Sequence, residues 1–382
     1  MRTLVLAGLC VAASLALGED GAPTDVDEGA TTFAGQSLVG AIAFQGKAMT
    51  VGGQSVALAD VDRITVVGDA ASSSLAAPVG VWLVDGGWVP CSTPTPGSQP
   101  DTIAVTTPYG TIELPLGEVL GWGPRADDRP GDAPPTGDRV VLAAEGGTTI
   151  DGSVLGVGPA GLTMKTSLGE IDVPLDGIAR LRLGLPASPP KGLHLTVALD
   201  PTRPPCAFAP ERPLRLRAAK DAVLTPPAQG WRLRVEGGRR VYLSALKPSA
   251  QEESGAFGTT WPWQRDSDLD GGPLLLAGVR HARGLVLHSR GRLTWDLAGG
   301  YTSLRGLIGI SDLVDGEGDC AVTLSGDGKP LWQRESVRGG EAPHAVEVGL
   351  DGVRTLELLV EFGARYDIGD HLAFADAYLV KK

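Results

Sequence analysis

The chain is poor in cysteine, methionine and aromatic residues, and it carries an excess of negative charge. Its 382 residues include four Cys, three Met and 5% aromatic residues, with a formal net charge of −12. This acidic balance argues against a surface that attracts nucleic acid or anionic lipid. No long apolar run follows residue 18, so the sequence predicts no membrane span either.

Cysteine usage argues against a disulfide framework. Cys10 lies in the apolar start of the chain, which leaves Cys91, Cys206 and Cys320, an odd and widely spaced set. That spacing is not the spacing of a zinc site, and at most one bridge can form within the chain. The sequence does not decide which pair would form it, and three thiols without a role are the favoured interpretation.

The first eighteen residues are typical of a secretory signal peptide. Arg2 gives a positive start, residues 4–17 are apolar, and Ala16-Leu17-Gly18 offers a small-x-small cleavage pattern. The stretch is too short for a membrane span, and Leu9 before Cys10 argues against a lipid anchor. We therefore expect an exported protein that is secreted, periplasmic or on the cell surface, and the low Lys content favours a GC-rich bacterial source.

What the chain has in plenty is glycine and proline. It contains 54 Gly and 29 Pro, yet 42% of its residues are hydrophobic, which predicts many short strands and tight turns rather than disorder. Apolar residues recur at every second position, and helical periodicity is absent. The sequence therefore predicts an all-β protein.

Three nine-residue segments in the first half share one pattern. They start 58 and 59 residues apart, and span Val56 to Ile64, Leu114 to Trp122 and Val173 to Leu181. Alternating runs with a Gly turn precede them, as in a hairpin with one buried face. We predict small β-barrel units, with unit boundaries at these residues: repeats one and two over 34–124, a linker over 125–137, repeat three over 138–185, and a degenerate β unit over 191–237.

These units loosely resemble Sm-like or SH3-like barrels. RNA binding, which such barrels often carry out, is not expected here, because the units lack basic and aromatic clusters. A structural spacer or an array of protein contacts is the favoured interpretation.

The region 239–382 alternates more regularly. Leu293, Trp295 and Leu297 point to one side of a strand, and similar runs follow at the spacing of a two-sheet sandwich. Its ordered blocks, which include Val241 to Pro248, Arg283 to Ser289 and Tyr366 to Ala377, resemble the NPCBM family of carbohydrate-binding modules. The resemblance implies a galactose-binding-like jelly roll that binds carbohydrate. One residue departs from the pattern, since Phe374 stands where the family usually has Trp, and an indole donor is thereby lost.

Sugar recognition needs a flat apolar surface for the C–H face of the ring and planar polar groups for the hydroxyls. The Trp261-Pro262-Trp263 segment and the polar loop from Tyr366 to His371 offer these groups. The predicted carbohydrate-binding residues are Trp261, Trp263, Trp332, Tyr366, Asp367, Asp370 and His371. The alternatives are ordinary packing for the Trp residues and a solvated turn for the loop. His281 and His288 are interpreted as structural histidines.

A short acidic segment matches the first half of an EF-hand loop. Asp266, Asp268 and Asp270 alternate before Gly271, but Ala277 stands at the twelfth position, where a bidentate Glu belongs. A plain acidic turn is the favoured interpretation and a structural calcium ion is the alternative. No other cofactor is expected.

No catalytic constellation is apparent in the sequence. Motifs for nucleophilic, zinc-dependent or phosphate-binding chemistry are missing, and no pair of carboxylates stands out for glycoside hydrolysis. The favoured hypothesis is an exported, non-catalytic protein whose jelly roll, displayed on a β-repeat stalk, binds carbohydrate or polysaccharide. The rival hypothesis is a structural or protein-interaction component of a bacterial cell-envelope assembly, with envelope proteins as partners.

Overall fold

The computed structural model describes residues 28–68, 77–125, 137–143, 147–200, 203–209, 212–217, 219, 222–227, 230–256 and 258–382. These residues form strands and single-turn 3₁₀ helices, which confirms the all-β prediction. The expected signal peptide at 1–18 lies outside the described residues, as does the expected linker apart from its ends at 125 and 137. Within the described ranges, no helix is long and apolar enough to cross a membrane.

Each of the three repeated segments contains a single-turn 3₁₀ helix. These helices are η1 (Leu58–Asp60), η2 (Leu116–Glu118) and η3 (Leu175–Gly177), and each begins with a buried Leu. The residue before each helix is extended, with φ between −56° and −68°, and in two of the three it is a Pro, whose ring fixes φ near that value. The sequence pattern located these positions but did not reveal the helices.

The strands of the first half fall into four consecutive groups. The first comprises β1 (Gly29–Thr32), β2 (Ser37–Val39), β3 (Ile42–Gln45), β4 (Ala48–Val51), β5 (Gln54–Ala57) and β6 (Val61–Val66). The second comprises β7 (Val79–Leu83), β8 (Trp88–Cys91), β9 (Thr95–Pro96), β10 (Thr102–Thr107), β11 (Gly110–Pro115) and β12 (Val119–Pro124). The third comprises β13 (Asp138–Leu142), β14 (Thr149–Gly158), β15 (Gly161–Thr166), β16 (Gly169–Val173) and β17 (Ile178–Arg182). The fourth comprises β18 (His194–Val197), β19 (Cys206–Ala209), β20 (Arg212–Leu216) and β21 (Trp231–Glu236).

In each group the first strand pairs antiparallel with the last, and the last strands also join the groups. β6 pairs with β21, and β12 pairs with β17, so the second and third groups are inserted between the first and the fourth. One apolar core runs through all four groups and includes Ile64, Trp122, Leu181 and Leu233. The resemblance of the groups to Sm-like or SH3-like barrels stays a prediction.

The three cysteines among the described residues are free thiols, two in the repeats and one in the C-terminal region. Cys91, Cys206 and Cys320 are all buried, and none forms a disulfide. Burial raises the pKa of Cys91 to about 12, and the Cys206 thiol donates to the carbonyl oxygen of Trp88 at 3.0 Å. Buried, protonated thiols of this kind are structural and unreactive.

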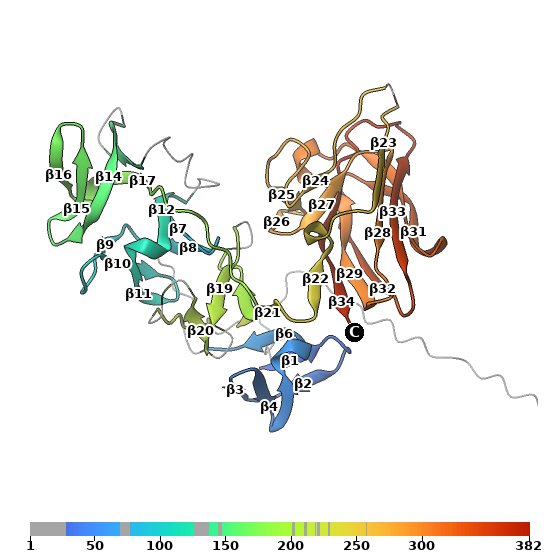
Figure 1. Ribbon diagram of the computed structural model, residues 1–382, viewed down its shortest axis with the longest axis horizontal. Helices are drawn as coiled ribbons and strands as arrows, with labels where there is room; N and C mark the ends of the chain where they lie inside the picture. Colours follow the sequence, from blue (N-terminus) through green and yellow to red (C-terminus); the bar gives the residue numbers. More distant parts are fainter. Residues whose placement is uncertain are drawn as a thin grey trace, which may run out of the picture.

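Residues from 240 onward fold into a sandwich of two antiparallel sheets (Figure 1). The six-stranded sheet consists of β24 (Gln264–Arg265), β27 (Gly284–Leu287), β34 (Leu372–Lys381), β29 (Tyr301–Ile310), β32 (His344–Gly349) and β22 (Arg240–Tyr242). The five-stranded sheet consists of β23 (Ala250–Glu253), β28 (Gly291–Asp296), β33 (Thr355–Phe362), β30 (Asp319–Gly326) and β31 (Lys329–Arg338). The short hairpin of β25 (Leu274–Leu276) and β26 (Val279–His281) and the 3₁₀ helices η4 (Leu243–Ala245) and η5 (Asp312–Val314) complete the region.

The core of the sandwich lies between its two sheets. Leu293, Trp295 and Leu297, the alternating residues that predicted a buried face, are at most 3% exposed. Phe374, where the resemblance leads us to expect a Trp, is fully buried in the same core. This residue therefore packs the sandwich and does not face solvent.

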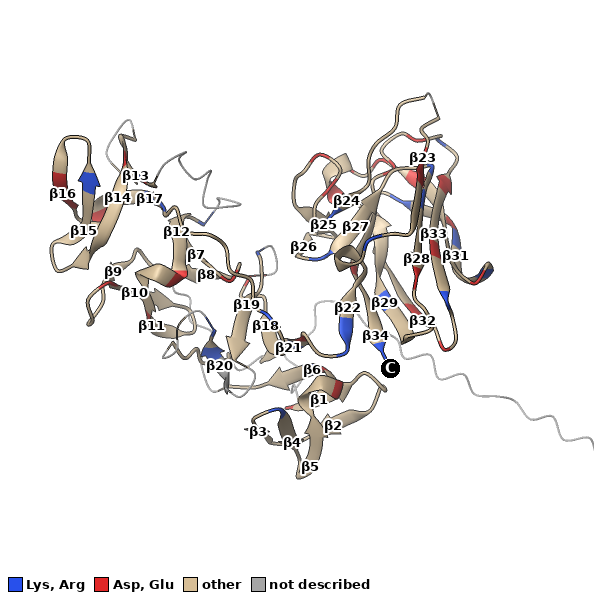
Figure 2. Cartoon of the chain, viewed as in Figure 1, with Lys and Arg blue, Asp and Glu red and all other residues tan. Residues whose placement is uncertain are grey.

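A buried polar cluster joins the sandwich to the first group of strands. Asp62 on β6 accepts hydrogen bonds from Arg240 on β22 and, at 3.1 Å, from the hydroxyl of Tyr378 on β34. The Arg240 guanidinium lies 4.2 Å from the centroid of the Tyr378 ring, and Arg305 donates to the carbonyl oxygen of Phe33 at 3.1 Å. Figure 2 shows the basic end of β22 at this junction. The sandwich is therefore held against the repeats by desolvated charges as well as by chain connection.

Candidate functional site

Several loops meet at one end of the sandwich. Ser254 and Arg290 exchange backbone hydrogen bonds of 2.9 Å, and the Ala256 amide donates to Asp367 at 2.8 Å. The Ser311 amide donates to the carbonyl oxygen of His371 at 2.9 Å, so four loops are tied together. In Figure 1 the connection from β23 to β24 lies at the end of the sandwich opposite the C-terminus and β22. The loops therefore face away from the junction with the repeats.

A cluster of three rings, here called the histidine cluster, lies among these loops. It comprises Trp261, His288 and His371. The Trp261 and His288 rings stack, with centroids 5.7 Å apart and planes 27° apart, and the two imidazole centroids are 6.0 Å apart. His288 and His371 are only 9% and 8% exposed, whereas Trp261 is 41% exposed. The cluster thus has a buried imidazole base and an accessible indole.

The strand register explains why the two histidines meet. β27 and β34 pair antiparallel, and Leu287 lies opposite Leu372. His288 follows Leu287 and His371 precedes Leu372, so the two histidines occupy facing positions just beyond the last pair of the ladder. Neighbouring side chains on one side of an antiparallel pair lie within contact distance.

Each histidine is anchored through Nδ1. The Nδ1 atom of His371 lies 2.7 Å from Oδ1 of Asp268, and that of His288 lies 2.8 Å from the carbonyl oxygen of Ser289. Within the described ranges neither Nε2 atom has a hydrogen-bond partner, and neither is enclosed by protein. Both rings therefore leave one nitrogen accessible.

Two buried carboxylates support this arrangement. Burial by itself raises the pKa of Asp268, but the interaction with His371 and other local contacts outweigh it and hold the pKa below its usual range. Burial raises the pKa of Asp370, although its Oδ2 accepts from the Ser289 hydroxyl and its Oδ1 from the Asp319 amide at 2.8 Å. Asp268 therefore stays ionised beside His371.

The structure brings together only some of the predicted carbohydrate-binding residues. Trp261 and His371 belong to the histidine cluster, and Asp370 lies beneath it as a support. Tyr366, which is 64% exposed, lies in the adjoining loop with Asp367, whose carboxylate accepts from the 254–256 segment.

The other two predicted Trp residues lie elsewhere. Trp263 is half-buried against the sandwich core, and its indole N–H donates to Gln251 at 3.1 Å. Trp332 packs on the same core from β31, opposite Leu324 and close to the turn between β30 and β31. That turn is at the far end of β30 from Asp319, which contacts Asp370. Neither indole reaches the histidine cluster.

His288 is the residue of the cluster that the sequence analysis did not select. Its role depends on a partner 83 positions away in the sequence, so nothing local distinguishes it from a structural histidine. Strand pairing could have identified it, because His288 follows the end of β27, and β27 pairs with β34, the strand that begins directly after His371. His281, by contrast, contacts Asp376 at 3.1 Å and stays a structural residue.

Two of the three carboxylates of the acidic segment have separate partners. Asp266 accepts from the Gly284 amide at 2.9 Å and from Arg283 at 2.8 Å, and Asp268 accepts from His371. Asp270 is exposed. Over the described residues, no group of three or more His, Cys, Asp or Glu side chains is arranged to hold a metal ion. A plain acidic turn stays the favoured interpretation of this segment, with calcium binding as the alternative.

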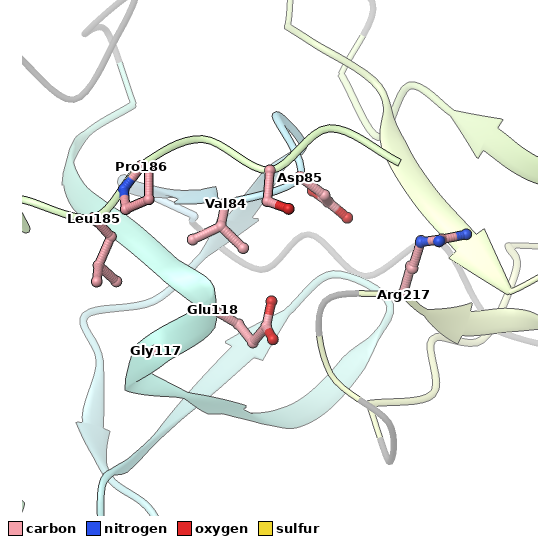
Figure 3. Close-up of a pocket in the computed structure, with 8 residues that line it drawn as sticks. Val84, Asp85, Gly117, Glu118, Leu185, Pro186 and Arg217 are labelled. Atoms are coloured by element: carbon pink, nitrogen blue, oxygen red, sulfur yellow. The ribbon is translucent and has the colours of Figure 1, made fainter. Parts of the chain in front are cut away.

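A cavity of about 360 Å³ lies among the repeats (Figure 3) and contains two acidic side chains. They are Asp85, from the turn between β7 and β8, and Glu118, from η2. However, Oδ1 of Asp85 accepts from the Gly87 amide at 2.9 Å, its Oδ2 is enclosed by protein, and burial raises its pKa. Asp85 is therefore part of the turn, and the cavity does not present the two accessible carboxylates that glycoside hydrolysis uses.

Comparison with known families identifies the sandwich. Residues 239–380 match the model of the NPCBM/NEW2 domain. The sandwich is an NPCBM domain. This confirms the resemblance found in the sequence and makes the region a carbohydrate-binding module.

Similar proteins include both enzymes and isolated modules. One is a curated protein of Renibacterium salmoninarum named "Putative endo-alpha-N-acetylgalactosaminidase", which is 30% identical over 91 residues. The match spans 24% of this chain and only 6% of the length of that protein.

Two similar solved structures contain CBM51 modules. The CBM51 of GH95 from Clostridium perfringens, solved with methyl-galactose, is 23% identical and covers 37% of this chain and 99% of its own, with a TM-score of 0.34. The tandem CBM51 modules of a family 98 glycoside hydrolase from Streptococcus pneumoniae are 13% identical and cover 64% of this chain and 88% of their own, with a TM-score of 0.33.

Proposed function

We propose that this protein is an exported, non-catalytic carbohydrate-binding protein whose NPCBM domain takes a sugar at the histidine cluster. The observation that carries the proposal is the indole of Trp261, which packs on a buried imidazole yet remains 41% exposed beside two accessible ring nitrogens. An aromatic face of this kind accepts the C–H face of a pyranose, and the nitrogens reach its hydroxyls.

The neighbouring loop extends this surface. Tyr366 and Ile368 are 64% and 54% exposed, in a segment that is tied to the Trp261 loop through Asp367. Exposed apolar side chains at adjoining loops are typical of a binding surface rather than of a core. They would widen the platform for a polysaccharide with more than one sugar in contact.

The proposal is tested by a glycan array probed with the full-length exported protein. The isolated sandwich is a poor choice, because it would expose Arg240, whose partner Asp62 belongs to the repeats. We expect the variant Trp261→Ala to lower affinity for a bound glycan at least tenfold, since it removes the stacking surface. Trp332→Phe is the matched control, because this ring packs on the core near the other end of the sandwich, and it should bind like the parent protein.

Two results would overturn the proposal. One is the absence of binding to any glycan, and the other is unchanged binding by Trp261→Ala. If the array is negative and the same loops retain an envelope protein in a crosslinking experiment, the rival function as an envelope component is favoured.

Export is tested separately by N-terminal sequencing of the protein recovered outside the cytoplasm. Cleavage after Gly18 would leave Glu19 as the first residue. Recovery of an intact Met1 from the cytoplasm would refute export and leave the binding proposal untouched.

A further inference from the structure

The two imidazoles of the histidine cluster have the same anchoring. In each ring Nδ1 faces an oxygen that can only accept, namely a carboxylate oxygen of Asp268 for His371 and the backbone carbonyl of Ser289 for His288. A neutral imidazole carries one proton, and an acceptor beside Nδ1 places that proton on Nδ1. Both Nε2 atoms are then left with a lone pair.

Both lone pairs are available to a ligand. The two side chains are more than nine-tenths buried, yet within the described part of the chain neither Nε2 atom has a partner or is enclosed. A polar atom on an otherwise buried side chain needs a hydrogen bond from water or ligand. Because the rings face each other across β27 and β34, with centroids 6.0 Å apart, one ligand can reach both nitrogens.

The charges around the cluster disfavour an anionic ligand. Asp268 and Asp370 are fully buried behind the two rings. Two arginines close to the cluster in the sequence are already paired, since Arg290 contacts Glu361 at 2.9 Å and Arg365 contacts Glu317 at 2.5 Å. A carboxylate or sulfate placed on the Nε2 atoms would meet two acceptors, with two buried carboxylates behind them.

We propose that Asp268 and the Ser289 carbonyl hold both histidines in the Nδ1–H tautomer, so that the site selects ligands that donate two neighbouring hydroxyl hydrogens. This inference rests on the proposed function, whose site it refines. Asp268 is then a positioning residue, which acts on the ligand through His371. The selected group is an uncharged pair of hydroxyls, and an acidic sugar is rejected at this position.

The first test determines the tautomers of His288 and His371 directly, without any ligand. Long-range ¹H–¹⁵N correlation spectra of the full-length protein near neutral pH should show protonated Nδ1 and unprotonated Nε2 in His288 and His371. The variant Asp268→Ala should shift His371 toward a mixture of tautomers and leave His288 unchanged. A proton on Nε2 of either ring in the parent protein overturns the proposal, whatever the protein binds.

The second test measures binding affinities by calorimetry. The ligands are the methyl glycosides of neutral hexoses, their monodeoxy analogues and the corresponding uronic acids. We expect a methyl glycoside that binds to lose about tenfold in affinity when either of two adjacent hydroxyls is removed, which is the loss for one hydrogen bond. In the His371→Phe variant, removal of one of these two hydroxyls from the ligand should no longer lower its affinity. His371→Gln, whose amide oxygen can replace the acceptor, should restore part of the loss.

The outcomes separate the two proposals. Binding that is indifferent to both hydroxyls, or that is as strong for the uronic acid, overturns the selectivity and leaves the proposed function intact. Absence of binding to the whole panel and to the glycan array overturns both. If Asp268→Ala does not fold, Asp268→Asn serves in its place, since its amide can also present N–H to His371 and so change the tautomer.

Discussion

The junction between the repeats and the NPCBM domain offers the sharpest test of the structural reasoning. The side chains of Asp62 and Arg240 are 6% and 1% exposed, so the ion pair between them is almost completely desolvated. The substitution Asp62→Ala leaves the Arg240 guanidinium buried, with Glu236 as its remaining carboxylate at 3.4 Å. Breaking a buried pair costs about 3–5 kcal/mol, and because Glu236 retains part of the stabilisation we expect about 3 kcal/mol.

The experiment is chemical denaturation of the full-length protein, with unfolding monitored by tryptophan fluorescence and by far-ultraviolet circular dichroism. Asp60→Ala is the matched control, because the Asp60 carboxylate is 51% exposed and contacts Arg239 at 3.3 Å on the same junction. An exposed pair of this kind contributes about 0–1 kcal/mol.

Asp62 also connects two parts of the molecule with separate cores. Its removal should therefore separate the unfolding of the repeats from that of the sandwich into two transitions. If Asp62→Ala costs no more than Asp60→Ala, the buried junction does not hold the two parts together and the reasoning is refuted.

Three further predictions concern acid stability, packing between repeats and calcium. Burial raises the pKa of Asp376, but the charge of Arg234 and other contacts outweigh it and hold the pKa well below its ordinary value. The ionised Asp376 therefore stabilises the fold above that ordinary pKa, and the free energy of unfolding should fall as the pH decreases below it. In acid denaturation, Asp376→Asn should flatten this decline. A methyl group on Gly121 would lie 2.1 Å from a carbonyl oxygen of β17, so Gly121→Ala should lower the free energy of unfolding by about 1–3 kcal/mol and lower the thermal midpoint. Gly117→Ala is the control, because its methyl group would have nothing within 4 Å, and it should leave the thermal midpoint nearly unchanged. The thermal midpoint should be the same with added calcium and with a chelator, because two carboxylates of residues 266–270 already have partners. A calcium-dependent rise of several degrees would show that the segment binds the ion.

The sequence by itself determined the class of the fold and much of its local structure. Alternation at Leu293, Trp295 and Leu297 predicted a buried strand face, because successive side chains of a strand point to opposite sides. The repeated segments located Leu58, Leu116 and Leu175, which are all buried. These features depend on neighbours in the chain, so a local pattern is enough to reveal them.

Tertiary structure decided how the pieces combine. The pairing of β6 with β21 brings the start of the chain beside a strand that begins 165 residues after β6 ends, and no local pattern specifies such a partner. The same limit applies to the junction, since the sequence near Asp62 does not show that it will meet Arg240 and Tyr378.

The candidate site shows both sides of this division. Trp261 and His371 could be selected from the sequence because exposed Trp and polar loop residues are chemically suited to sugars, whereas Trp263 and Trp332 carry the same chemistry and pack elsewhere. His288 joined the site only when the register of β27 and β34 was known. The sequence determined which side chains were available, and the strand pairing decided which of them meet, because a binding site requires closeness in space between residues that are far apart along the chain.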